Sequence, residues 1–174
     1  GKKIYQNLSI GFNLNLLNAS YDTFTSFGLS SNISTTYLNQ EKQFVSTFLI
    51  KNIGRQLTAF STFKENLPFE IQCAISKELA HLPFRYHLTY NNINDFNIKS
   101  PYKLTSQTNV DSGELELQEE SIAKTALRHI VIGGEFNPFR KSFFVRGGFN
   151  FQRRFDLTTV NRPAMVGFSW GVGF

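Results

Sequence analysis

Large apolar residues recur at every second position through much of the chain. Residues 8–16 carry Leu, Ile, Phe, Leu and Leu at their even positions, and residues 166–174 carry Val, Phe, Trp, Val and Phe in the same way. A period of two is typical of β-strands, whose side chains alternate between the two faces of a sheet. The residues between them in 167–173 are glycine and serine, without charge. This favours a strand with one face in lipid over a strand of a soluble sandwich, whose outer face normally carries charge.

The same alternation predicts about eight strands of the length that tilted strands of a membrane barrel need. We expect them at residues 8–16, 27–37, 44–50, 69–76, 84–90, 130–136, 143–151 and 166–174.

The expected connections alternate in length. Residues 39–42, 77–83 and 137–141 are short connections, whereas residues 52–66, 91–128 and 152–163 are long. Transmembrane barrels have short periplasmic turns and longer outer loops, so we expect the long set to face outside and Phe174 to lie at the periplasmic rim. Within the longest connection, residues 119–128 predict a short helix with Ile122 and Ala126 on one face.

Composition agrees with strands rather than helices as the membrane-crossing elements. The chain has 174 residues, 19 of them Phe, a net charge of +5 and a mean hydropathy of -0.22. This length predicts a single domain, 1–174, and no apolar run approaches the roughly 20 residues of a spanning helix. Cys73 is the single cysteine, which excludes an intrachain disulfide. The expected fold is all-β, an antiparallel transmembrane β-barrel integral to the outer membrane.

Pairing apolar residues across hairpins gives an expected register. Phe84 opposite Phe136 puts Arg85 opposite Glu135, and Arg146 follows on the next strand. These three charged residues would form a cluster inside the barrel near its periplasmic end. We favour a structural role for this lumen cluster, filling space and fixing register, over ligand gating.

Extending the pairing to the last two hairpins predicts the neighbours of Arg146. Phe143 opposite Phe136 places Gly133 beside Arg146, and the last hairpin places Gly171 on its other side. It also sets Trp170 against the glycine at position 147, where we expect the indole ring to cover that glycine.

No motif in the sequence specifies an enzyme. The strings G-x-S-x-G, H-E-x-x-H and the Walker motif do not occur, and the spacing of His81, His87 and His129 fits no metal site. The aromatic residues follow strand faces and are not interleaved with basic residues, which argues against nucleic-acid binding. We expect a noncatalytic protein without cofactor or metal.

Two groups of residues in the long connections are candidates for contacts outside the barrel. Arg153, Arg154 and Arg162 are placed to meet lipopolysaccharide phosphates, which arginine binds through paired hydrogen bonds; solvated loop charges are an equal alternative.

The second group lies in residues 91–128, a connection far longer than the usual median of about 4 to 6 residues. It contains the aromatic residues Phe96 and Tyr102 and an acidic stretch that includes Glu114 and Glu116. Acidic residues would be repelled by lipopolysaccharide phosphates, so we expect this extracellular loop to dock a protein partner. The alternative, a loop that only caps the barrel mouth, stays open.

Two segments carry a resemblance to a known family. The strings "KNIGRQL" at 51–57 and "EFNP" with "FFVRGGFNFQRR" at 135–154 make the chain similar to the PorQ family, whose members are outer-membrane components of the type IX secretion system. These proteins are similar to PorV and to FadL-type barrels. The resemblance extends over most of the chain and implies a barrel of about 14 strands. We therefore expect strands before Gly1 and favour an internal strand at Phe174, followed by a final hairpin.

The resemblance implies an anchoring role without chemistry. PorQ-like proteins are associated with a cell-surface attachment complex in which they hold PorZ, together with PorU and PorV. The alternative is a FadL-type transporter that passes hydrophobic molecules through the outer membrane. A complete small barrel of about eight strands, with its first and last strands paired, also remains open at this stage.

Overall fold

The fold is a single antiparallel sheet of nine strands in the computed structural model, which describes residues 1–21, 24–59, 66–98, 121–139, 143–157 and 165–174. Each strand pairs with its neighbours along the chain, in the order β1 to β9. The elements are β1 (Lys2–Tyr5), β2 (Leu8–Tyr21), β3 (Phe24–Asn39), β4 (Phe44–Thr58), β5 (Glu70–Glu78), β6 (Phe84–Tyr90), α1 (Ile122–Arg128), β7 (Ile130–Phe136), β8 (Phe144–Asn150), α2 (Phe151–Leu157) and β9 (Phe168–Gly173).

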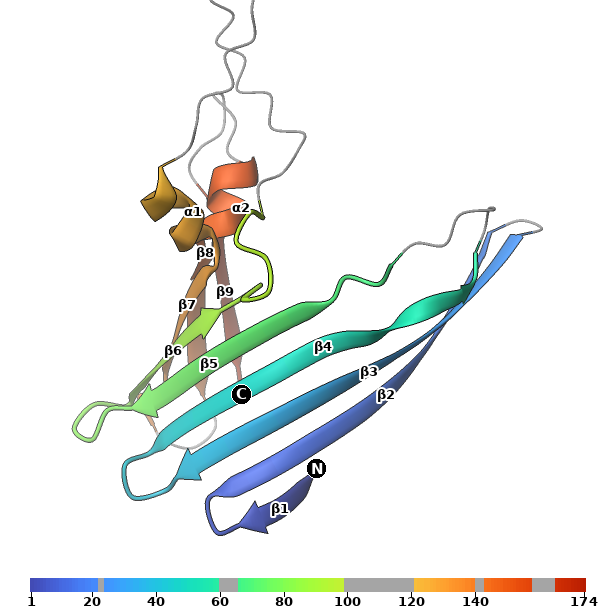
Figure 1. Cartoon of the computed structure of the whole chain (residues 1–174). Coiled ribbons are helices and arrows are strands. Elements are labelled where there is room, and N and C mark those ends of the chain that lie inside the picture. Colours follow the sequence, from blue (N-terminus) through green and yellow to red (C-terminus); the bar gives the residue numbers. More distant parts are fainter. Residues whose placement is uncertain (22–23, 60–65, 99–120, 140–142, 158–164) are drawn as a thin grey trace, which may run out of the picture.

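The sheet is strongly curved, so that β7, β8 and β9 pass behind β5 and β6 in Figure 1. The short turns at residues 6–7, 40–43 and 79–83 lie together at one end of the strands, which we call the short-turn end. Helices α1 and α2 lie at the opposite end, the long-loop end. The expected short and long connections are present, but β2 and β3, which are also joined at the long-loop end, have only residues 22–23 between them. The C-terminus follows β9, which runs away from α2.

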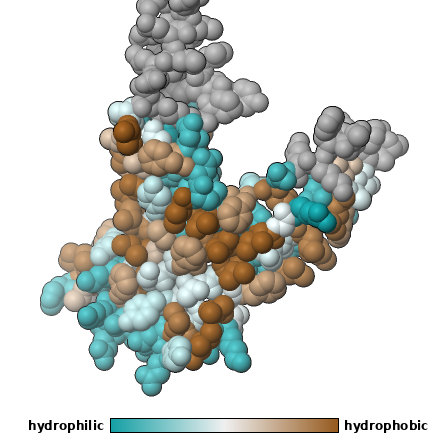
Figure 2. All heavy atoms as spheres, in the orientation of Figure 1, coloured by the Kyte–Doolittle hydropathy of each residue, from teal (hydrophilic) through white to brown (hydrophobic). Residues whose placement is uncertain are grey.

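One face of the sheet is apolar from β2 to β9. In register, Phe12, Ile33, Ile50 and Ile71 form one continuous line across β2 to β5. Leu88, Ile132, Phe149 and Phe168 form a second line across β6 to β9. Figure 2 shows apolar atoms gathered over the middle of the strands and hydrophilic atoms toward the short-turn end. We call this side of the sheet the apolar face.

The apolar face is exposed, and no apolar side chain of the described residues is buried. The most buried strand side chains are instead Ser26 and Ser30, which lie on the opposite, polar face. Small polar residues fit the inner side of a curved sheet, where neighbouring strands crowd the side chains. This distribution is the reverse of that in a water-soluble domain, in which the apolar face points inward.

A bulge in β4 keeps its apolar residues on one face. The register of β3 against β4 shifts between Ser31 and the next paired residue, Ile33, because Asn52 is an extra residue in β4. Asn52 has a φ of 57°, a left-handed conformation that asparagine tolerates better than most residues. The inserted residue returns Ile53 to the face that carries Ile50. The interruption of the alternation explains why the sequence predicts a loop from 52, whereas β4 continues to Thr58.

All eight expected strands are present, although most of them begin or end at other residues than expected. β6 and β7 have the expected bounds, whereas β2 and β3 extend almost to their hairpin. The sequence pattern did not predict β1, because the segment from Lys2 to Tyr5 lacks alternation; it pairs with the start of β2.

The expected strand 143–151 ends one residue early, because Phe151 begins helix α2. The Asn150 side-chain oxygen accepts a hydrogen bond from the Arg153 backbone N–H at 3.0 Å, in the manner of a helix N-cap. The Phe151 ring then packs edge-on against Phe149, with ring centroids 4.8 Å apart. The long connection 152–163 therefore starts with a helix.

The short helix expected at 119–128 is confirmed as α1, with Ser121 as its N-cap. The expected apolar side is wrong, because Ile122 is 79% exposed and the buried residues of the helix are Thr125 and Arg128. The helix therefore packs through polar side chains.

The close approach of β3 and β4 predicts that Gly54→Ala destabilises the sheet. An added Cβ would lie 2.0 Å from the Leu29 carbonyl oxygen and 2.6 Å from the Ser30 Cα, so the backbones must separate. We expect the free energy of unfolding to fall by about 1 to 3 kcal/mol, measured by urea unfolding. Gly171→Ala is the control, because its Cβ meets no atom of the described chain within 4 Å. Equal effects of the two substitutions would contradict the β3–β4 packing.

Candidate functional site: a charged row on the polar face

Four charged side chains of alternating sign cross the polar face near the short-turn end. Glu78 of β5 is opposite Arg85 of β6, which is opposite Glu135 of β7, which is opposite Arg146 of β8. The Arg85 Nη2 lies 2.7 Å from the Glu78 Oε2, and the Arg146 Nε lies 2.7 Å from the Glu135 Oε2. We call these four residues the charged row.

The charged row fixes strand positions more than it contributes to stability. The Arg146 side chain is 60% exposed and that of Arg85 is 38% exposed, so solvent screens both ion pairs. Such exposed pairs are worth only about 0 to 1 kcal/mol each. A shift of one strand by two residues, however, would move a charge away from both neighbours at once, which disfavours the alternative registers.

The expected contact of Arg85 with Glu135 is confirmed as a cross-strand pairing. The carboxylate that accepts the hydrogen bond from Arg85 is however that of Glu78, which the sequence analysis did not include. All three members of the expected lumen cluster, Arg85, Glu135 and Arg146, lie on the polar face.

The expected glycine beside Arg146 on β7 is wrong, because Gly133 is opposite Gly148 and Arg146 is opposite Glu135. Phe143 precedes β8, so Phe136 pairs two residues further along, with Val145. The alternation has a period of two, and a slip of two residues keeps every side chain on its expected face. The pattern alone could not distinguish these registers.

The expected pairing of the last hairpin is confirmed, with Arg146 opposite Gly171 and Trp170 opposite Gly147. The indole ring does not cover the glycine, because a Cβ built on Gly147 meets no described atom within 4 Å and Trp170 is 78% exposed.

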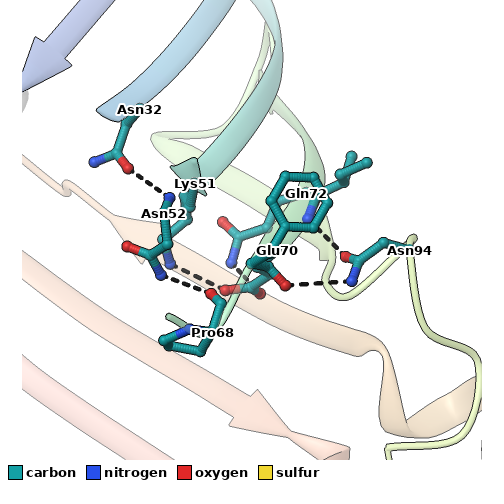
Figure 3. Close-up of polar contacts among 9 residues, drawn as sticks. Asn32, Lys51, Asn52, Pro68, Glu70, Gln72 and Asn94 are labelled. Atoms are coloured by element: carbon teal, nitrogen blue, oxygen red, sulfur yellow. Dashed lines mark hydrogen bonds and ion pairs between the residues drawn. The ribbon is translucent and has the colours of Figure 1, made fainter. Parts of the chain in front are cut away.

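A second polar cluster connects β3, β4 and β5 at the bulge (Figure 3). The Lys51 Nζ lies 3.1 Å from the Glu70 Oε2, and Gln72 donates a hydrogen bond of 2.5 Å to the other oxygen of Glu70. The Asn52 backbone N–H donates to the Asn32 side-chain oxygen at 2.9 Å, and its side-chain amide donates to the Pro68 carbonyl at 2.7 Å. These bonds satisfy the backbone and side chain of the bulged residue.

The same cluster also holds the chain that follows β6. The Asn94 side chain accepts a hydrogen bond from the Ile71 N–H at 2.8 Å and donates to the Phe69 carbonyl at 3.2 Å. β6 ends at Tyr90, opposite Cys73, so the residues of β5 before Cys73 have no partner on β6. The bonds of Asn94 take the place of that pairing. The cluster therefore has a structural function at the start of the 91–128 connection.

Helices α1 and α2 pack through an ion pair between Arg128 and Asp156, the side chains of which are 2% and 15% exposed. The Arg128 guanidinium also lies over the Phe155 ring, 5.4 Å from its centroid. Breaking a buried ion pair leaves an uncompensated charge, at a cost of about 3 to 5 kcal/mol. The two helices thus form one unit, which we call the helical cap.

Next to the helical cap, His129 is fully buried at the start of β7. Its ring stacks on those of Tyr90 and Phe96, with centroid distances of 5.1 and 5.7 Å. Phe96, expected to be a partner-docking residue, therefore has a structural contact, although half of its surface (52%) stays exposed.

The remaining candidate residues divide between the helical cap and the part of the chain that is not described. Arg153 and Arg154, expected to contact lipopolysaccharide, both lie on α2 at the long-loop end. Outside the described residues lie Tyr102, Glu114, Glu116 and Arg162.

The described residues contain no group of three or more His, Cys, Asp or Glu side chains that could hold a metal ion. Neither described helix is long and apolar enough to cross a membrane. Comparisons of the chain with protein-family models, with curated proteins and with solved structures find no match. The site is therefore interpreted from its geometry alone.

The alternation of the charged row predicts an incomplete rescue by charge exchange. Exchanging one pair, Glu135→Arg with Arg146→Glu, restores their attraction but sets Arg85 opposite a new arginine. Like charges directly opposite on a sheet destabilise it by about 0.2 to 1 kcal/mol. We expect the double variant to stay less stable than the unmodified protein, and the further exchange Glu78→Arg with Arg85→Glu to recover the loss. Urea unfolding followed by fluorescence of the single tryptophan, Trp170, measures both. Full recovery in the double variant would show an isolated pair instead of a row.

Proposed function

We propose that the sheet is part of the wall of an outer-membrane β-barrel and that the protein is a noncatalytic anchor in the type IX secretion system. The observation that carries the membrane assignment is the exposed apolar face, which continues across β2 to β9 while the polar face contains the buried serines. An exposed apolar surface of this extent is unfavourable in water. Lipid covers it without cost, and the polar face then lines the barrel lumen.

Strand length and connections support the same proposal. β2, β3 and β4 have 14 to 16 residues, more than the about 9 to 11 that a tilted strand needs to cross a bilayer, and β5 has 9. β6, β7, β8 and β9 have only six or seven residues, so the support from strand length comes from the first half of the sheet. The described sheet is open, with free edges on both its first and last strands. A barrel therefore requires further strand pairing at both edges, in agreement with the barrel of about 14 strands that the PorQ-like segments imply.

The anchoring role rests on the resemblance to the PorQ family and on the long-loop end. In this proposal, the 91–128 connection docks PorZ of the attachment complex, which also contains PorU and PorV. The helical cap lies at this end and carries exposed apolar side chains, among them Ile122 and Leu157. Exposed apolar residues in water are typical of protein contacts. On the same cap, Arg153 and Arg154 would contact lipopolysaccharide phosphates.

A second candidate function, transport of hydrophobic molecules as in FadL-type barrels, is favoured by one cavity. It has a volume of about 310 Å³ and lies at the long-loop ends of β2, β3 and β4. Its walls include the apolar side chains of Leu17, Ala19, Leu67 and Pro68, together with the polar side chains of Asn18, Ser26, Gln56 and Asn66. A cavity of this kind suits a small apolar molecule. The remaining polar face is lined by charged and hydroxyl groups, which makes the anchor our first choice.

Cysteine labelling on intact cells tests the membrane assignment and its orientation. In a Cys73→Ser background, Ile122→Cys at the long-loop end should react with a membrane-impermeant maleimide. Gln40→Cys at the short-turn end should react only after the outer membrane is permeabilised, because short turns face the periplasm. Labelling of Gln40→Cys alone would invert the orientation, and equal labelling of both in intact cells would contradict the membrane assignment.

Replacement of residues 98–118 by a short Gly/Ser linker tests the docking role separately. We expect the barrel still to insert and resist urea, because the replacement leaves every described strand intact, but PorZ to be lost from purified outer membranes. Pull-down of PorZ quantifies the loss. The control is a replacement of residues 79–82 in the short turn by glycine and serine, which should leave PorZ bound. Unchanged PorZ retention with a folded barrel would assign the docking to another surface.

A further inference from the structure

The His129 ring lies between two carbonyl oxygens. Its Nδ1 is 2.8 Å from the carbonyl oxygen of Asn91, and its Nε2 is 3.2 Å from the carbonyl oxygen of Phe96. A carbonyl oxygen only accepts hydrogen bonds, whereas a neutral imidazole has one N–H and one lone pair. A neutral ring therefore turns a lone pair toward one of the two oxygens. Only the imidazolium, which carries both protons, donates to both.

The two carbonyls belong to the turn that follows β6, whereas the histidine is at the start of β7. The main chain joins these segments through one hydrogen bond, from the Asn91 N–H to the His129 carbonyl at 2.8 Å. The Asn91 end of the turn is thus held without the ring. The middle of the turn is held to β5 by the Ile93 N–H and the Asn94 side chain. The Phe96 end is held to His129 by the Nε2 bond and by ring stacking.

We propose that His129 is a proton-operated latch for the start of the 91–128 connection. With both ring nitrogens protonated, the latch closes on Asn91 and Phe96 together. Loss of one proton leaves the shorter bond to Asn91 and turns the Nε2 lone pair toward the Phe96 oxygen, which releases the Phe96 end. Closure takes up a proton, so the closed turn is favoured as the pH falls and is lost as the pH rises.

Two aromatic rings stack on the imidazole. Tyr90 of β6 and Phe96 of the turn present aromatic rings to it, and such faces stabilise a cation. The charged groups of the neighbouring segments have partners of their own: Arg128 of α1 pairs with Asp156 of α2, and the Asp95 carboxylate accepts a hydrogen bond from the Asn97 N–H at 2.9 Å. Lys124 of α1 lies over the Phe155 ring of α2, 5.3 Å from its centroid.

Histidine is the side chain whose charge ordinarily changes between about pH 5 and 8, the range in which a cell-surface protein meets changing conditions. The latch would couple that change to the position of Phe96. It does not depend on what the 91–128 connection binds, and it would operate whether this segment docks a protein or only caps the sheet.

Hydrogen–deuterium exchange of the folded protein in detergent micelles tests the latch. The turn has two reporter amides: Asp95 donates to the Asn92 carbonyl, and Asn97 donates to the Asp95 side chain. We compare protection factors, which are corrected for the intrinsic exchange rate, at about pH 5.5 and about pH 8. The Asp95 and Asn97 amides should lose protection about tenfold or more at the higher pH, as expected for loss of a charged hydrogen bond. Peptides 84–90 and 130–136 should not change. Equal protection of residues 91–98 at both pH values would overturn the proposal.

A matched pair of variants assigns the effect to the ring. His129→Phe keeps an aromatic ring for stacking but removes both donors, so the turn should have low protection at both pH values. His81→Phe, on the exposed short turn, should keep the full pH response. A pH response that persists in His129→Phe would show that another group is responsible. The strand peptides report whether each variant is folded, and the pH comparison on the unmodified chain stands without the variants.

Discussion

The structure depends on keeping one face of a curved sheet apolar from β2 to β9. Every strand contributes alternate residues to each face, so a shift of one residue anywhere would move that strand's apolar side chains to the polar side. The bulge at Asn52 shows how strictly this constraint is kept, because the extra residue restores Ile53 to the apolar face. The side-chain and backbone bonds of Asn52 to Asn32 and Pro68 offset the ladder bonds that the bulge interrupts.

Burial of apolar side chains cannot stabilise the inner side of such a sheet, because none of the described ones is buried. Specific polar contacts must therefore define the arrangement there. The charged row does so at the short-turn end, and the Lys51–Glu70 cluster does so where β5 begins. Both sets are partly exposed to solvent, so each contact adds little stability, but a misaligned strand would lose several of them together.

The sequence predicts the strands well because alternation is a local signal. It also predicts the pairing of Arg85 with Glu135, since a matched apolar pair, Phe84 and Phe136, lies beside it. It fails at Arg146 because a register two residues away satisfies the same pattern. The choice between the two depends on where β8 begins, and the sequence predicts that boundary one residue too early.

No local pattern in the sequence predicts the contacts of the helical cap. Arg128 and Asp156 are 28 residues apart, and the sequence around each resembles an ordinary solvated helix. The burial of His129 follows from three segments that meet only in the folded chain, although its position just before a strand is visible in the sequence. Glu78 could have been found, because the hairpin that pairs Tyr86 with Lys77 on the apolar face pairs its neighbours Arg85 and Glu78 on the polar face.

The two ends of the sheet consequently differ in how they are held. At the short-turn end, tight turns and the two ion pairs of the charged row fix neighbouring strands to one another through residues close in sequence. At the long-loop end, the fixing contacts join segments distant in sequence, through Arg128, Asp156 and His129. Contacts of the second kind depend on a few buried polar groups whose loss is costly. The arrangement of the long-loop end therefore depends on charged and hydrogen-bonded groups more than on apolar packing.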